Sequence, residues 1–220
     1  MSDRAAKLRK LNDWRRRLPH CTASALGAVL KEIQKNGLPE GCDLSRNAIR
    51  HARDEVAATQ TPHGTLLQTI TVFDKDENEV EVTIAHPLAM LWQATKDCSS
   101  FTVFFLARLK KHPPSPEQPW TLVIYTDEVT PGNPLATLNN RKFHALYWSF
   151  LEFGVQALCR EECWFCACTE YSILVAPLSA GLSQLVASVL TKFFSDGVNL
   201  ATTGMLLPFE EQNIRLNIAD

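Results

Sequence analysis

The sequence lacks several features that would assign a protein to a broad class at once. Its 220 residues contain no apolar run near the ~18 residues that a membrane span requires, and no apolar segment near Met1 typical of a secretory signal. It has no internal repeat and no low-complexity tract. The formal charge of -2 and isoelectric point near 6.3 give no overall sign of a nucleic-acid or membrane partner. We therefore expect an intracellular protein, nuclear or cytoplasmic, that does not contact membranes.

Cysteine is present in an odd number, and its spacing is not that of a disulfide framework. The seven thiols lie mostly within apolar stretches, which fits a reducing compartment. Cys159, Cys163, Cys166 and Cys168 have the number of thiolates that a zinc site needs. However, Cys166 and Cys168 alternate with apolar residues in CWFCACTEYSILV, where cysteine acts as a small apolar side chain. We expect these cysteines to pack rather than to bind zinc. A thiol-dependent enzyme would need one of them exposed near His144.

Positive charge is concentrated at the start of the chain. Residues 1–20 contain seven Lys or Arg and two Asp, a formal charge of +5, which leaves -7 for the remainder. The run Arg15, Arg16 and Arg17 beside Trp14 is typical either of a nucleic-acid-binding or nuclear-targeting segment or of a solvated helical tail. Both readings stay open at this point.

The first half of the chain is predicted to contain helices and one hairpin. Apolar residues at helical spacing predict a helix over 22–36 that ends at Gly37, and a second helix that begins after Ser45. Arg46 and Arg50 lie on the polar side of the second helix, as in a DNA-recognition helix, although two acidic residues follow closely. Runs over 65–73 and 79–85, the second of them alternating, then predict a β-hairpin with one solvent-exposed face. Apolar segments over 87–95 and 99–109 predict two further helices.

Residues 112–119 contain four prolines in eight residues, which predicts a stiff, extended linker or crossing segment. We place the main boundary there, between an N-terminal region 1–111 and a C-terminal region 120–220. The C-terminal pattern predicts three strands followed by a helix, over 121–129, 143–153, 163–175 and about 178–195. The aromatic run FHALYWSFLEFG favours a buried central strand, with base stacking as the alternative. The whole chain is expected to have an α+β fold.

Asp127 and Glu128 end the first strand of the C-terminal region. Metal-assisted phosphoryl transfer needs two or three carboxylates that converge on a divalent cation, and a strand holds such a side chain rigidly. The alternative is a polar strand end before the turn at 131–134. Asp220 ends the alternating stretch IRLNIAD and is a further candidate ligand.

Several stretches carry a resemblance to a known group of proteins. These are YTDEVTPGNPL, RKFHALYWSFLEFG, WFCACTEY and LSAGLSQLVASVLTKFF, preceded in the same order by ALGAVLKEIQKNGLPE, SRNAIRHARDE, TPHGTLLQTI and PLAMLWQA. In them the sequence resembles multicopy, uncharacterised proteins of dinoflagellate genomes. It is more distantly similar to transposon-encoded proteins with a ribonuclease H-like, DDE transposase-like core. The resemblance covers most of residues 20–200.

The resemblance implies an incomplete ribonuclease H-like core in which Asp127 is the first metal-binding acid. An active protein of this kind would use Mg²⁺, with Glu128 or Asp220 as second ligand and a polynucleotide phosphodiester as substrate. Because longer relatives continue past the position of Asp220, the resemblance implies a shortened copy. We expect a transposable-element-derived protein without catalytic activity of its own, associated with DNA through its basic segment. A non-enzymatic protein- or nucleic-acid-binding module is the alternative.

Overall fold

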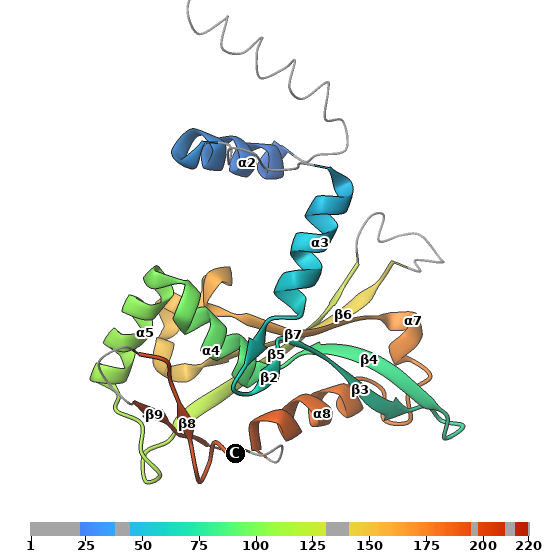
Figure 1. Ribbon diagram of the computed structural model, residues 1–220. Helices are drawn as coiled ribbons and strands as arrows, with labels where there is room; N and C mark the ends of the chain where they lie inside the picture. The colour runs from blue at the N-terminus through green and yellow to red at the C-terminus, as the bar shows by residue number, and fades with distance from the viewer. Residues whose placement is uncertain (1–22, 38–44, 131–140, 195–197, 210–213, 220) are drawn as a thin grey trace, which may run out of the picture. The chain divides into compact units, whose positions relative to one another are not determined.

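The computed structural model describes residues 23–37, 45–130, 141–194, 198–209 and 214–219. The chain divides into two compact units, Met1–Ala52 and Arg53–Asp220. The first unit contains α2 (Ala23–Asn36) and the start of α3 (Arg46–Ala57), and the second contains the remaining elements (Figure 1). Within the described ranges, no helix is both long and apolar enough to cross a membrane.

The two helices predicted for the first part of the chain are confirmed, and their ends have clear physical causes. Gly37 ends α2 with a φ of 73°, and its N–H donates to the carbonyl of Ile33 at 2.9 Å. Ser45 precedes α3, and its Oγ accepts from the N–H of Ala48 at 3.2 Å.

The second unit begins with two β-hairpins and two helices. The hairpin predicted over 65–85 is confirmed, because β3 and β4 pair antiparallel along their whole length and alternate exposed with less exposed residues. The bounds are β1 (Gln60–Thr61), β2 (Gly64–Thr65), β3 (Leu67–Phe73), β4 (Glu79–Ala85), α4 (Pro87–Asp97) and α5 (Ser99–Lys111). The helices therefore lie where the sequence predicts them.

A four-stranded sheet in the order β10-β5-β6-β7 forms the centre of this unit. β5, β6 and β7 are antiparallel neighbours, and β10 is parallel to β5 on its other edge. The main bounds are β5 (Trp120–Val129), β6 (Phe143–Phe150), β7 (Phe165–Tyr171), α8 (Leu182–Phe194) and β10 (Ile218–Ala219). The short elements are η1 (Leu151–Phe153), α6 (Val155–Leu158), η2 (Glu161–Cys163), α7 (Ser172–Val175), β8 (Met205–Leu206) and β9 (Arg215–Leu216).

Three C-terminal segments are shorter or more divided than predicted. The strand predicted over 143–153 ends at Phe150, and the strand predicted over 163–175 is confined to 165–171, because short helical turns replace its ends. The stretch IRLNIAD forms two strands on either side of Asn217 instead of one. Its first part pairs with β8 and its second part with β5, which requires the chain to change partners at Asn217.

The proline-rich segment 112–119 lies within the second unit. The indole Nε1 of Trp120 donates to the carbonyl of His112 at 2.7 Å, which ties the two ends of the segment together. The N–H of His112, the residue that ends α5, donates to the carbonyl of Arg108. One residue, Cys98, separates α5 from α4 before it. The segment is thus a tight crossing from α5 to β5.

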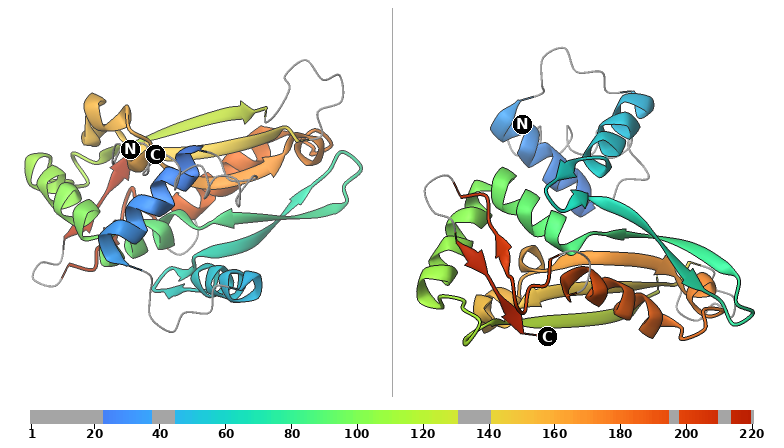
Figure 2. Two further views of the ribbon diagram at one scale, coloured as in Figure 1. Left: turned by 90° about the horizontal axis from the view of Figure 1, so that it is seen from above. Right: turned by 60° about the horizontal axis from the view of Figure 1, so that its bottom comes forward.

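One face of the sheet, the inner face, is covered by α5, α8 and the β3–β4 hairpin (Figures 1 and 2). Phe105 of α5 lies with its ring centroid 5.4 Å from that of Trp120 and 6.4 Å from that of Phe150. Trp148 contacts Phe193 of α8 edge to face at 5.1 Å. The predicted burial of the aromatic strand is confirmed for Trp148 and Phe150, whereas Tyr147 points to the opposite, outer face.

The β6–β7 ladder contains a bulge that sets which face each cysteine of β7 occupies. Leu146 lies opposite Cys168 and Tyr147 lies opposite Cys166, so Ala167 is the extra residue. Cys166 therefore shares the outer face with Tyr147, and Cys168 shares the inner face with Leu146. Ala167 and Cys168 are both buried.

We expect Phe105→Ala to lower the free energy of unfolding by about 3–5 kcal/mol, because the truncation leaves a cavity among packed rings. Val103→Ala is the matched control on α5, since Val103 is 70% exposed, and it should change stability by less than about 0.5 kcal/mol. Urea unfolding followed by tryptophan fluorescence measures both. An equal loss in the two variants would contradict the placement of Phe105 in the core.

Candidate functional site

Asp127 lies on the outer face of the sheet, near the end of β5. It is exposed, and its register partner on β6 is Ala145, which in turn lies opposite Thr169 on β7. Tyr125 is two residues earlier on the same strand and so shares this face. The Asp127 carboxylate is therefore presented to solvent beside aromatic and hydroxyl side chains.

Glu128 points to the inner face, as adjacent residues of a strand must point in opposite directions. Its Oε1 accepts from Ser172 Oγ at 2.9 Å, its Oε2 lies 3.3 Å from Lys142 Nζ, and His144 Nε2 is 4.0 Å away. The Ser172 hydrogen bond and then Lys142 lower the pKa of Glu128. The carboxylate is thus ionised and already held by a hydroxyl and a cation.

Asp127 and Glu128, the two candidate acids among the described residues, do not converge on one point. Asp127 and Glu128 lie on opposite faces of one strand. Asp220 lies outside the described residues, and Ala219 just before it pairs with Thr121. Thr121 is six residues before Asp127, about 20 Å along the strand. No group of three His, Cys, Asp or Glu residues in the described part of the chain is placed to hold a metal ion such as Mg²⁺.

The cysteines of residues 159–168 point in different directions. Cys159 is exposed, Cys163 accepts a hydrogen bond at its carbonyl from the buried Ser149, and Cys166 lies on the outer face. Cys168 is buried, and burial raises the pKa of its thiol to about 12. Cys168 lies opposite Leu146, two residues along β6 from His144. The cysteine of β7 that lies near His144 in register is therefore a buried, protonated thiol.

The arginines proposed for nucleic-acid binding lie mostly outside what the structure describes. Arg15, Arg16 and Arg17 fall outside the described residues, and the side chain of Arg46 is not described. Arg50 is exposed on α3. The basic segment therefore stays a prediction.

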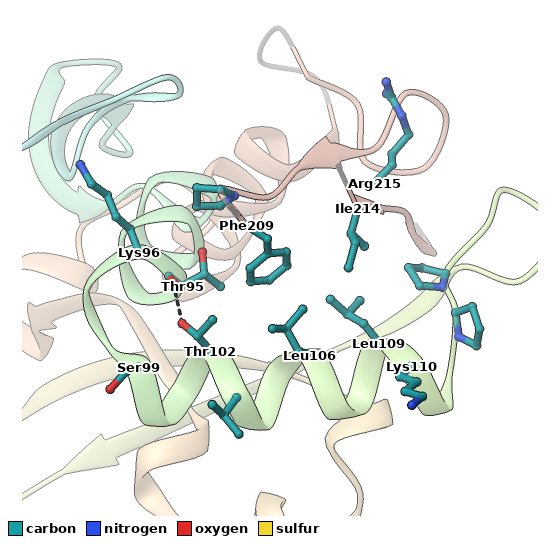
Figure 3. Close-up of a pocket in the computed structure, with 14 residues that line it drawn as sticks. Thr95, Lys96, Ser99, Thr102, Leu106, Leu109, Lys110, Phe209, Ile214 and Arg215 are labelled. Carbon is teal, nitrogen blue, oxygen red and sulfur yellow. Dashed lines mark hydrogen bonds between the residues drawn. The ribbon is translucent and has the colours of Figure 1, made fainter. Parts of the chain in front are cut away.

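Sequence reasoning missed a groove of about 1190 Å³ that runs beside α5 (Figure 3). We call it the α5 groove. Thr102, Leu106 and Leu109 of α5 line one side, at the spacing of a single helix face. Phe209 and Ile214 line the other side and come from the C-terminal part of the chain. The groove has an apolar interior along about three turns of helix.

Three cations stand among the residues that line the α5 groove. Lys96, Lys110 and Arg215 come from three separate segments, and the described lining includes no Asp or Glu. Lys96 Nζ lies 5.0 Å from the ring centroid of Trp92, and the Arg215 guanidinium donates to the carbonyl of Thr203. Lys96 and Lys110 lie in the last turns of α4 and α5, and nothing in the local sequence pattern links them to Arg215.

Comparisons with protein-family models, with curated proteins and with solved structures each gave no match.

The thiols should differ in reactivity because their surroundings differ. Cys98 is exposed at the start of α5, and its hydrogen bond with Ser100 Oγ at 3.4 Å lowers its pKa, whereas burial raises the pKa of Cys166 and Cys168. At pH 8 the Cys98 thiolate fraction is larger than that of Cys166 or Cys168, so iodoacetamide should modify Cys98 before either of them. Peptide mass spectrometry measures the rates. Ser100→Ala should slow the modification of Cys98 by iodoacetamide. Equal modification rates for Cys98 and Cys168 in the folded protein would contradict the exposed position of Cys98 and the buried position of Cys168.

Proposed function

We propose that this chain is a transposable-element-derived, non-catalytic nucleic-acid-binding protein built on a ribonuclease H-like scaffold. The α5 groove is the observation that carries the binding part of the proposal. The strand order and the positions of the acids support the scaffold and the lack of catalysis.

The topology of the second unit supports the ribonuclease H-like scaffold. Three antiparallel strands, β5, β6 and β7, are followed by α8, which is the order predicted from the sequence pattern. The strand that follows α8 in the sheet, β10, returns to β5 and runs parallel to it. Asp127 then belongs to the first strand of the sheet in chain order.

The directions of the acids support a role without catalysis. A two-metal mechanism needs carboxylates that meet around ions about 4 Å apart. Asp127 faces outward, and Glu128 faces inward with its oxygens engaged by Ser172 and Lys142. A metal ion at Glu128 would have to displace the Lys142 ammonium.

The chemistry of the α5 groove fits a single-stranded nucleic acid. Cations beside an apolar channel can hold phosphates while the bases contact apolar side chains. Lys96 and Lys110 are among the residues that line the groove, and the Phe209 ring points into it toward Leu106 (Figure 3). Thr95 and Thr102 also line the groove, with their hydroxyls donating to backbone carbonyls, Thr102 Oγ1 to that of Thr95 and Thr95 Oγ1 to that of Trp92 at 2.8 Å.

The groove predicts a defined salt-dependent binding defect. For a labelled oligothymidine of roughly 15 nucleotides, the double variant Lys96→Gln/Lys110→Gln should weaken binding about 10-fold at low salt. The slope of the logarithm of the binding constant against the logarithm of salt concentration should be smaller in magnitude by about two. Lys75→Gln/Lys111→Gln removes the same charge at two exposed lysines outside the groove and should bind nearly as the wild type does. Fluorescence anisotropy at several salt concentrations measures this. Equal losses in both variants would exclude the groove as the binding surface.

The non-catalytic part of the proposal has its own test. Wild type and Asp127→Asn are incubated with single- and double-stranded polynucleotides and Mg²⁺ or Mn²⁺, and products are followed on gels. We expect no cleavage or strand transfer above background from either protein. Divalent-metal-dependent cleavage by the wild type that Asp127→Asn abolishes would instead establish a polynucleotidyl transferase or nuclease.

A further inference from the structure

Three aromatic side chains gather on the outer face of the sheet, away from the core. We call Tyr125, Tyr147 and Trp164 the aromatic patch. Tyr125 and Tyr147 are register partners on β5 and β6, and Trp164 directly precedes β7. Tyr125 is 52% exposed, and the other two are partly exposed. A large aromatic surface open to solvent is a common feature of binding sites.

The rings of the aromatic patch are held in a fixed arrangement. The centroids of Tyr125 and Tyr147 are 6.3 Å apart with the ring planes 24° from parallel. Trp164 lies 6.2 Å from Tyr125 at 61°, and its indole N–H donates to the Leu158 carbonyl at 2.9 Å. The indole N–H is therefore occupied, and the ring is fixed in place before any ligand arrives. Pre-ordered rings cost little conformational entropy on binding.

Negative charge borders the aromatic patch on two sides. Asp127 follows Tyr125 by two residues on the same strand face, and Glu161 lies in η2, just before Trp164. The N–H of Trp164 donates to the carbonyl of Glu161 at 3.0 Å, which holds Glu161 beside the patch. Burial raises the pKa of Tyr147, and the negative charges of Asp127 and Glu161 add to the rise. Arg160 lines a separate hollow beside α5 with Arg108.

This combination selects a positively charged ligand. Aromatic faces attract ammonium and guanidinium groups, and nearby carboxylates strengthen the attraction. The same carboxylates repel phosphate, so the aromatic patch is unsuited to the nucleic acid proposed for the α5 groove. A strand-sized flat surface fits an extended chain segment better than a folded domain.

We propose that the aromatic patch, with Asp127 and Glu161, binds a lysine or arginine side chain in an extended basic segment of a partner protein. The cation lies over the Tyr125 and Trp164 faces, and Asp127 balances its charge. The inference is independent of the α5 groove, and it gives Asp127 a binding role that needs no metal ion.

The test uses short peptides that carry one arginine among glycines and serines, with a norleucine peptide as the uncharged control. Binding to the full chain is followed by NMR through the indole N–H resonance of Trp164, assigned with Trp164→Phe. The arginine peptide should shift this resonance and bind at least ~5-fold more tightly than the norleucine peptide, with affinity falling as salt rises.

Variants separate the aromatic patch from general effects. Tyr125→Ala and Asp127→Asn should each weaken arginine-peptide binding by about 3–5-fold, and Tyr125→Phe should retain it. Tyr171→Ala removes an equally exposed tyrosine of the same sheet outside the patch and should have no effect. Unchanged resonances elsewhere confirm that each variant is folded.

Three results would overturn the proposal. Binding of the norleucine peptide as tight as that of the arginine peptide would show that charge is not recognised. An oligonucleotide that shifts the Trp164 resonance, with no shift from the arginine peptide, would indicate a base-stacking surface. Self-association of the wild type that Tyr125→Ala abolishes would make the patch an interface between copies of this chain.

Discussion

Burial of one face of the sheet around Phe105 is the constraint on which the second unit depends. Because Trp120 and Phe150 must contact that ring, a slip of one residue in β5 or β6 would turn their large side chains to solvent. The register of the whole sheet is therefore fixed by its apolar side. The fixed register also sets the direction of the polar side chains, so Asp127 lies on the outer face and Glu128 on the inner face.

Much of the secondary structure could be predicted from local patterns. Helical spacing with Ser45 and Gly37 at the termini located α2 and α3, and strict alternation located the β3–β4 hairpin. Strand ends were harder, because the helical turns that follow Phe150 and Tyr171 depend on local packing rather than on an obvious breaker. The bulge at Ala167 leaves no sign in an apolar run, yet it decides which cysteine is buried.

The α5 groove and the aromatic patch, the two surfaces proposed to bind ligands, could not have been predicted in the same way. The α5 groove joins a helix near residue 100 to a segment beyond residue 205, and local periodicity carries no information about such a meeting. The aromatic patch was hidden for a different reason. Tyr147 belongs to a run of aromatics that is mostly core, and only the alternation of faces separates it from Trp148. Asp127 was singled out as a metal ligand, whereas its neighbours now suggest a charge partner for a cation.

The parallel pairing of β10 with β5 has a consequence for how the unit is assembled. The N–H of Trp120 donates to the carbonyl of Asn217. This hydrogen bond at the start of β5 joins two residues that are nearly one hundred positions apart in the sequence. Contacts so distant in sequence form slowly, since a long loop must be closed first. Until that closure, the start of β5 at Trp120 and Thr121 has unpaired N–H and carbonyl groups on this edge. During synthesis this edge is the point at which the nascent chain is most exposed to pairing with the wrong strand.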